Sequence, residues 1–462
     1  MIVDRYDPVN LFALVPQLQL HMQPELAALD HLLDDDVLFS QVKADLLRRF
    51  PHSARKGRHS TPVEVILRML VLKHLYDWSY EQTELFVNDS LVFRQFCRLY
   101  LAKAPDDTTL IRWANQIQPQ TLHALLERVV HLAHQHTVTR GRKLRTDGTV
   151  VKTTIHYPTD SSLLGDGVRV LSRTLRKARQ VLGEMVQGSQ HLFRDRTRSA
   201  KQQVKRILDA TRRRGPQVEH TMRDAYEHLV TTTHATVQQA QQVQTLLREQ
   251  TTEAAVSLSK TLTLFIPRVQ QVLEQTKRRV FAGETVPAEQ KIVSLFEPHT
   301  AIIRKGKVAQ ATEFGRVVWL DEVEGGIVSR YEVLEGNPPE DRQLPPSLDH
   351  HMNLFGHPPR LLTGDRGTYS PQNEQYAEKV GVKQVVLPKP GGKSKAREEH
   401  ERQAWYRRGR RWRAGIEGRI SGLKRGQGLE RCRNRGSDGM ERWVGWGIIA
   451  YDLRVIARTR AA

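Results

Sequence analysis

The sequence predicts a mixed α/β fold in which five strands with flanking helices follow an N-terminal helical domain. Apolar residues at helical spacing fill the first part of the chain, and β-branched or apolar runs recur after residue 140. Between these runs lies a long stretch that is nearly free of glycine and proline, which predicts a helical insertion between the first and second strands. We therefore expect a helical domain at 1–138, an α/β domain at 139–168 and 291–462, and a helical insertion at 169–290.

The N-terminal part contains three helix starts that can be identified from their capping residues. Thr61-Pro62 supplies a hydroxyl cap and a proline in the first turn. Ser79 and Gln82 have the spacing of a capping box, and several capping residues occur at 105–108. Three short capped helices favour a helix-turn-helix-like DNA-binding domain. A helical bundle that supports another domain is an equally open alternative.

The α/β part begins with a β-branched run that contains Asp147. Two further runs flank a Gly325-Gly326 turn, which predicts a hairpin. A short apolar strand then ends at Asp365, and another apolar strand follows the next helix. The five expected strands lie at 145–151, 313–320, 327–333, 360–365 and 382–387.

The insertion has two long helix-forming segments separated by Gly215-Pro216. They predict a long antiparallel helical hairpin that turns at this pair. Residues 169–279 hold 21 basic and 9 acidic side chains. Such a hairpin suits a solvated arm, a dimerisation element or an arm that tracks along DNA, and the sequence favours none of them.

The charge of the chain points to a polyanionic partner. The formal net charge is +20 and the pI is about 10.1, which favours binding to nucleic acid. Two cysteines exclude a disulfide framework and a cysteine-rich zinc site. No apolar run approaches the roughly 18 residues of a membrane-spanning helix. We expect no membrane partner and a cytoplasmic protein that acts at the bacterial nucleoid.

Three carboxylates are candidates for a catalytic site. Asp147 lies within a β-branched run, Asp365 ends an apolar strand, and Glu417 lies in a stretch (389–435) with 16 basic and 5 acidic side chains. Acids rarely occupy such places unless they are paired or bound to a cation. Oxygen ligands without thiolates suit Mg²⁺ or Mn²⁺, and two such ions about 3.5–4 Å apart support phosphodiester chemistry.

Basic residues surround Glu417 at spacings that suit one helix. Offsets of −7, −4 and +7 place Arg410, Arg413 and Lys424 on its helix face. Three glycines in the same segment, at 415, 418 and 422, each cost roughly 1 kcal/mol relative to alanine and suggest close approach of a sheet or of DNA. The candidate phosphate-binding residues are Arg410, Arg413, Arg419, Lys424 and Arg425.

The order Asp147, Asp365, Glu417 resembles that of the DDE transposases of bacterial insertion sequences, whose catalytic core is RNase H-like. In that core the first Asp lies on the first strand, the second lies just after the fourth strand, and the Glu lies on a later helix. Arg413, Glu417 and Lys424 fit a motif of this family, although Arg410 stands where the motif has tyrosine. The resemblance covers most of the chain apart from about 169–290. Other similar segments are Asp147-Gly148-Thr149, Tyr157-Pro158-Thr159-Asp160, Glu313-Phe314-Gly315, Glu335-Gly336-Asn337-Pro338 and Thr363-Gly364-Asp365-Arg366-Gly367.

The resemblance implies a function and its partners. The three acids would hold two Mg²⁺ or Mn²⁺ ions, and the protein would bind the terminal inverted repeats of its insertion sequence as double-stranded DNA. It would hydrolyse a strand at each end to free a 3′-hydroxyl, join that hydroxyl to target DNA, and act as a homodimer that pairs two ends. Two alternatives stay open: a metal-dependent nuclease or resolvase on the same fold, and a catalytically inactive or host-adapted DNA-binding protein.

Overall fold

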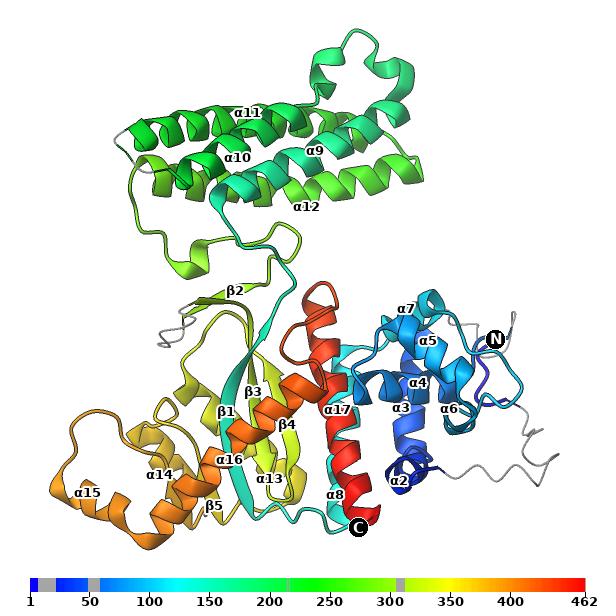
Figure 1. The fold of residues 1–462 in the computed structure, drawn as a ribbon, viewed down its shortest axis with the longest axis vertical. Coiled ribbons are helices and arrows are strands. Elements are labelled where there is room, and N and C mark those ends of the chain that lie inside the picture. The colour runs from blue at the N-terminus through cyan, green and yellow to red at the C-terminus, as the bar shows by residue number, and fades with distance from the viewer. Residues whose placement is uncertain (7–21, 49–58, 214, 216, 305–311, 462) are drawn as a thin grey trace. The chain divides into compact units, whose positions relative to one another are not determined.

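The computed structural model describes residues 1–6, 22–48, 59–213, 215, 217–304 and 312–461, with the side chain of residue 184 excepted (Figure 1). The chain forms two compact units. The first comprises Met1–Thr154 and Arg316–Ala462, and the second comprises Ile155–Gly315. The candidate acids all belong to the first unit.

The structure contains a mixed sheet of six strands, one more than the sequence predicted. Strands follow the order β2-β3-β1-β5-β6, and β4 also pairs with β3. Strand β2 pairs with Thr312–Gly315 at the start of β3 and was not predicted, because four residues are too few to show a periodic pattern. The β2-β3 and β3-β4 pairs are antiparallel, whereas β1-β5 and β5-β6 are parallel. The strands are β1 (Lys143–Lys152), β2 (Ala301–Arg304), β3 (Thr312–Val323), β4 (Ile327–Val333), β5 (Leu361–Thr363) and β6 (Gln384–Val386).

Two of the three predicted caps in the described N-terminal residues are formed, whereas the predicted Thr61 cap is not, because Pro62 occupies the N-cap position of its helix and no side chain caps it. Ser79 and Gln82 make both hydrogen bonds of a capping box, with N···O distances of 2.9 and 3.1 Å. Asp106 caps a further helix by accepting a hydrogen bond from the Thr109 N–H. The helices are α2 (Pro24–Leu32), α3 (Asp36–Arg48), α4 (Val63–Leu75), α5 (Tyr80–Asp89), α6 (Leu91–Phe96), α7 (Asp107–Ala114) and α8 (Pro119–Gln135).

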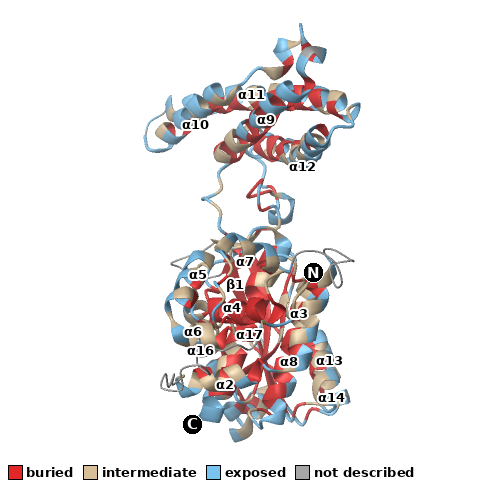
Figure 2. Ribbon diagram, turned by 90° about the vertical axis from the view of Figure 1, so that its right-hand side faces the viewer, coloured by how far each residue is buried: buried red, intermediate tan, exposed pale blue. Residues whose placement is uncertain are grey.

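The remaining helices of the first unit pack around the sheet. The C-terminal helix α17 contacts α2, α4, α8 and β4, and it buries Trp443 and Trp446 between them. The N-terminal helices and the sheet thus share one hydrophobic core, which appears as buried red segments in Figure 2. The helices of the first unit that follow the N-terminal ones are α13 (Leu344–Phe355), α14 (Pro371–Lys379), α15 (Lys395–Arg402), α16 (Ala404–Gly426) and α17 (Ser437–Ala461).

The described residues of the second unit form a bundle of four α-helices rather than the two-helix hairpin that the sequence predicted. They are α9 (Asp160–Leu182), α10 (Thr197–Thr211), α11 (Gln217–Arg248) and α12 (Glu253–Thr276), and they bury a core of their own. The chain turns between α10 and α11 at Gly215, as predicted, while residue 216 lies outside the described residues. The turn between α11 and α12 contains neither glycine nor proline, so no helix-breaking residue marks it in the sequence. Thr252 nevertheless caps α12 by accepting a hydrogen bond from the Ala255 N–H.

Candidate active site

Two of the three candidate acids come together because β1 and β5 are parallel neighbours. Their register pairs Arg145 with Thr363. Asp147 and Asp365 each lie two residues further along the chain, so they meet at the same end of the two strands. Asp365 is fixed by the turn that follows it, since its Oδ1 accepts hydrogen bonds from the N–H groups of Gly367 (2.9 Å) and Thr368 (3.1 Å).

Helix α16 carries the third acid to the neighbourhood of Asp147. The helix packs against β1, β5 and β6. The Arg413 guanidinium donates to Asp147 Oδ2 at 2.8 Å and to Glu417 Oε1 at 3.3 Å. The Asp147 side chain is 13% exposed and that of Glu417 is 71% exposed. A single arginine therefore links a buried carboxylate to a solvent-exposed one.

A fourth carboxylate, Glu340, lies beside the two aspartates and was missed by the sequence analysis. It begins the 3₁₀ turn Glu340–Gln343 and shares a hydrogen bond with Asp365. A side chain at Gly367 would collide with Glu340 Oε2, so this close approach requires glycine there. Glu340 follows the segment Glu335-Gly336-Asn337-Pro338, but nothing in its own local pattern distinguishes it from a surface acid.

Two carboxyls of the cluster, those of Asp147 and Glu340, have raised pKa values. Burial raises the pKa of Asp147 to about 6; Arg413 opposes this increase, and Asp365 adds to it. Burial, followed by repulsion from Asp365 and Asp147, raises the pKa of Glu340 to about 7. A bound cation would offset both the desolvation of these acids and the repulsion between them.

A buried ion-pair network sets the orientation of α16 against the sheet. Glu322 on β3 is 1% exposed and accepts two hydrogen bonds from Arg145 on β1, at 2.9 and 2.6 Å. It also accepts one from Arg419 on α16 at 3.1 Å. Arg145 further donates to the Trp412 carbonyl and stacks over the Trp412 ring, 4.7 Å from its centre. The network thus anchors both ends of the α16 turn that carries Arg413 and Glu417.

The other predicted phosphate-binding residues have different environments. Arg419 is occupied by Glu322 and the Tyr451 hydroxyl, and Lys424 lies 3.5 Å from Glu430. Arg410 and Arg425 are exposed. Arg410 lines a hollow of about 580 Å³ on α16 together with Arg407, Arg408 and Arg411. The last three were not singled out from the sequence, although the run of arginines is visible in it.

The three glycines of α16 do not share one environment. A Cβ at Gly415 would lie 2.5 Å from Arg145 Nη1, so this glycine permits close packing on the network, as expected. Gly418 and Gly422 face open space. Their lack of a side chain leaves the helix backbone accessible from outside the protein.

The donor chemistry of the site fits a hard divalent cation. Asp147 and Asp365 supply carboxylate oxygens, which Mg²⁺ and Mn²⁺ prefer, and Glu340 lies beside them. In the part of the chain that the structure describes, no three His, Cys, Asp or Glu side chains stand ready as a metal-binding group. The Glu417 carboxylate accepts a hydrogen bond from Arg413. The observation that supports a cation here is the meeting of Asp147 and Asp365 at one end of neighbouring strands, where burial raises the pKa of Asp147 to about 6.

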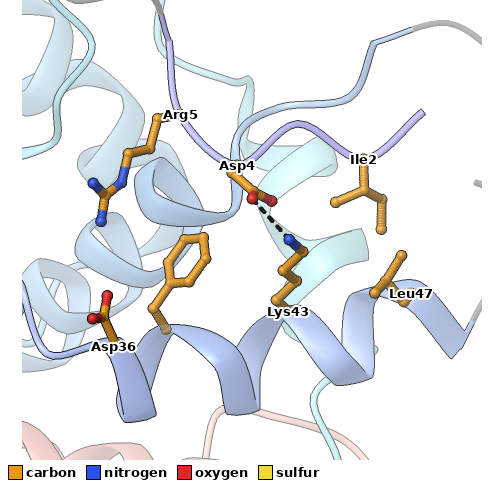
Figure 3. A pocket seen from close by; sticks show the side chains of 7 residues that line it. Ile2, Asp4, Arg5, Asp36, Lys43 and Leu47 are labelled. Carbon is orange, nitrogen blue, oxygen red and sulfur yellow. Dashed lines mark hydrogen bonds and ion pairs between the residues drawn. The ribbon is translucent and has the colours of Figure 1, made fainter. Parts of the chain in front are cut away.

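A separate hollow of about 710 Å³ lies among the N-terminal residues and is lined by Ile2, Asp4, Arg5, Asp36, Phe39, Lys43 and Leu47 (Figure 3). Three of its four charged side chains form ion pairs: Lys43 lies 2.7 Å from Asp4, and Arg5 lies 3.3 Å from Glu64. None of the candidate acids lines it. The hollow therefore belongs to the packing of the N-terminal segment on α3 and α4.

Comparison with known families bears on the N-terminal helices. Residues 11–116 match the model of a family described as "Transposase domain (DUF772)". This part of the chain is similar to a transposase domain. This match supports a transposase of an insertion sequence, although it ends before the first candidate acid. Comparison with curated proteins and with solved structures finds no significant match. Among the described residues, no helix has the length and apolar character needed to cross a membrane.

Proposed function

We propose that this protein is a DDE-type transposase that cleaves DNA at the ends of its insertion sequence and joins the freed 3′-hydroxyls to target DNA. The observation that carries the proposal is the meeting of Asp147 and Asp365 on neighbouring parallel strands, with Glu417 linked to Asp147 through Arg413. The transposase domain in the same chain supports it independently.

The arrangement of the sheet supports an RNase H-like core. Asp147 lies on the first strand, Asp365 follows β5, and Glu417 lies on a later helix. If the short strand β2 is set aside, β5 is the fourth strand of the sheet. This is the placement of the three acids that the resemblance to DDE transposases implies.

Each group of the site has a part in this proposal. Asp147, Asp365 and Glu417 would hold two Mg²⁺ or Mn²⁺ ions, which supply an activated oxygen nucleophile and stabilise the leaving oxygen when bound. Glu340, whose pKa is raised to about 7 by burial and by Asp365 and Asp147, lies beside these ligands. Arg413 keeps the Asp147 carboxylate oriented, and the exposed Arg410 and Arg425 grip phosphates on either side of Glu417.

Strand cleavage tests this proposal. Purified protein is incubated with duplex DNA that carries the inverted repeats flanking its gene, with Mg²⁺ or with a chelator. We expect cleavage that leaves a 3′-hydroxyl in Mg²⁺ only, and loss of cleavage by at least 10³-fold in Asp147→Ala, Asp365→Ala and Glu417→Ala. The exposed acid Glu399 on α15 provides a matched control, and Glu399→Ala should cleave normally.

The outcomes separate the three candidate functions. Cleavage without sequence preference and without joining would identify a nuclease or resolvase instead. Sequence-specific binding without any cleavage would identify an inactive DNA-binding protein. Full activity in any of the three acid variants would refute the catalytic assignment.

A further inference from the structure

The positive charge of the helical bundle is concentrated in the first half of its sequence. Residues 169–214, which include most of α9 and all of α10, hold 14 basic and 3 acidic side chains. Residues 217–279, which include α11 and α12, hold 7 basic and 6 acidic side chains. A charge that served only solubility would not need this separation, because both halves are equally part of the bundle surface.

Helix α10 presents its cations on the face opposite to the bundle core. Ala200, Ile207 and Ala210 are buried against α9 and α11. The opposite face carries the α10 stripe, which we define as Arg198, Lys201 and Lys205 on α10 together with Arg212 at its C-cap. All four are exposed and follow one another at spacings of three, four and seven residues, which keeps them on one side of a helix.

The cations of the α10 stripe are not neutralised within the described part of the chain. The structure gives none of the four an ion pair, whereas the neighbouring Arg206 pairs with Asp224 at 3.1 Å. Asp209 is the one acid on the same face. Four cations held close together beside a single acid repel one another, and an external polyanion offsets that repulsion.

The dimensions of the α10 stripe suit a DNA backbone. A rise of 1.5 Å per residue spreads Arg198 to Arg212 over about 21 Å. Duplex DNA presents one phosphate per strand about every 3.4 Å along its axis, so several phosphates lie within that span. Arg173 and Lys177 are exposed on α9, which packs directly on α10, and they add charge to the same half of the bundle.

From these observations we infer that the α10 stripe is a second DNA-binding surface, which contacts the phosphate backbone of duplex DNA without reading its sequence. A second copy of this chain is a poorer occupant, because two such faces would repel each other. The inference shares with the proposed function the assumption that DNA is the partner. It is independent of the acids, because the stripe lies in the other unit of the chain.

The test compares two fourfold variants of the full chain. In the first, each residue of the α10 stripe becomes glutamine. The matched control changes four exposed cations elsewhere in the same unit to glutamine: Arg223, Arg248, Lys260 and Lys277. Affinity for a random-sequence duplex is measured without divalent cations over a range of salt concentrations. Thermal melts check that both variants are folded.

Each phosphate contact contributes about 0.9 to the slope of log K against log salt concentration. We expect the stripe variant to lose about 3–4 from that slope and at least tenfold in affinity at about 0.15 M salt, and the control to lose less than 1. Lys201→Arg with Lys205→Arg should bind like the wild type, because the charge is kept.

Equal slopes for the stripe and control variants would overturn the inference, whatever the cleavage assay shows. If the stripe variant lost binding to poly-glutamate but bound DNA as the control variant does, the inference would be overturned in favour of an acidic protein partner. Wild-type protein that binds duplex through the stripe but never cleaves would refute the proposed function and leave this inference standing.

Discussion

Replacing Glu322 by glutamine should destabilise the unit that contains the candidate acids. Among the described residues, Glu322 is the carboxylate that accepts hydrogen bonds from the guanidinium groups of both Arg145 and Arg419. Glutamine keeps the size of the side chain but removes its charge. The two guanidinium groups would then remain close together in a buried site without a counter-charge.

The expected loss of stability follows from the burial of Glu322 and from the number of its hydrogen bonds. Breaking a buried pair by removing one partner typically costs about 3–5 kcal/mol. Glu322 accepts three charge-assisted hydrogen bonds while being 1% exposed, which places it within that range. For a unit of roughly 300 residues, this corresponds to a fall in melting temperature of about 5–10 °C.

Thermal and urea unfolding of the full chain provide the assay. Glu430→Gln is the matched control: Glu430 also pairs with two cations, Lys152 at 2.5 Å and Lys424 at 3.5 Å, but it is 51% exposed. Its substitution should cost no more than about 1 kcal/mol. Glu322→Gln should also reduce DNA cleavage, because α16 would lose an anchor. Equal stability of the two variants would refute the argument from burial.

Two further predictions concern the acids and the packing of α16. The pKa values of Asp147 (about 6) and Glu340 (about 7) are raised, so the folded protein binds protons at these carboxyls more tightly than the unfolded chain does. The stability that this proton binding contributes should be fully present below about pH 4 and should be lost as the pH rises to about 7. In the presence of a chelator, the free energy of unfolding should fall by about 1–3 kcal/mol over this range. The double variant Asp147→Asn, Glu340→Gln should show a smaller fall, and an unchanged pH dependence in that variant would contradict the assignment. Gly409→Ala should destabilise by about 1–3 kcal/mol, because its Cβ would lie 2.7 Å from the Val386 side chain. Gly418→Ala faces open space and should stabilise by up to about 1 kcal/mol; unfolding measurements that rank these two variants in the opposite order would contradict the packing.

The sequence by itself determined the features that depend on neighbouring residues. The capping box at Ser79 and the strand that carries Asp147 follow from local hydrogen-bonding and apolar patterns. The two aspartates could be predicted as partners because each marks a strand, and strand ends of a parallel pair meet. The predicted hairpin failed at the turn between α11 and α12, since local sequence shows no breaker there and the packing of the bundle decides where the chain reverses.

Only the tertiary structure decided which charges face one another. Arg419 and Arg413 lie six residues apart on one helix, yet one is bound to Glu322 and the other to Asp147. Glu340 joins the aspartates from a loop that has no periodic pattern. The physical reason is that an ion pair depends on distances of a few ångströms between segments remote in sequence, which composition and spacing do not encode.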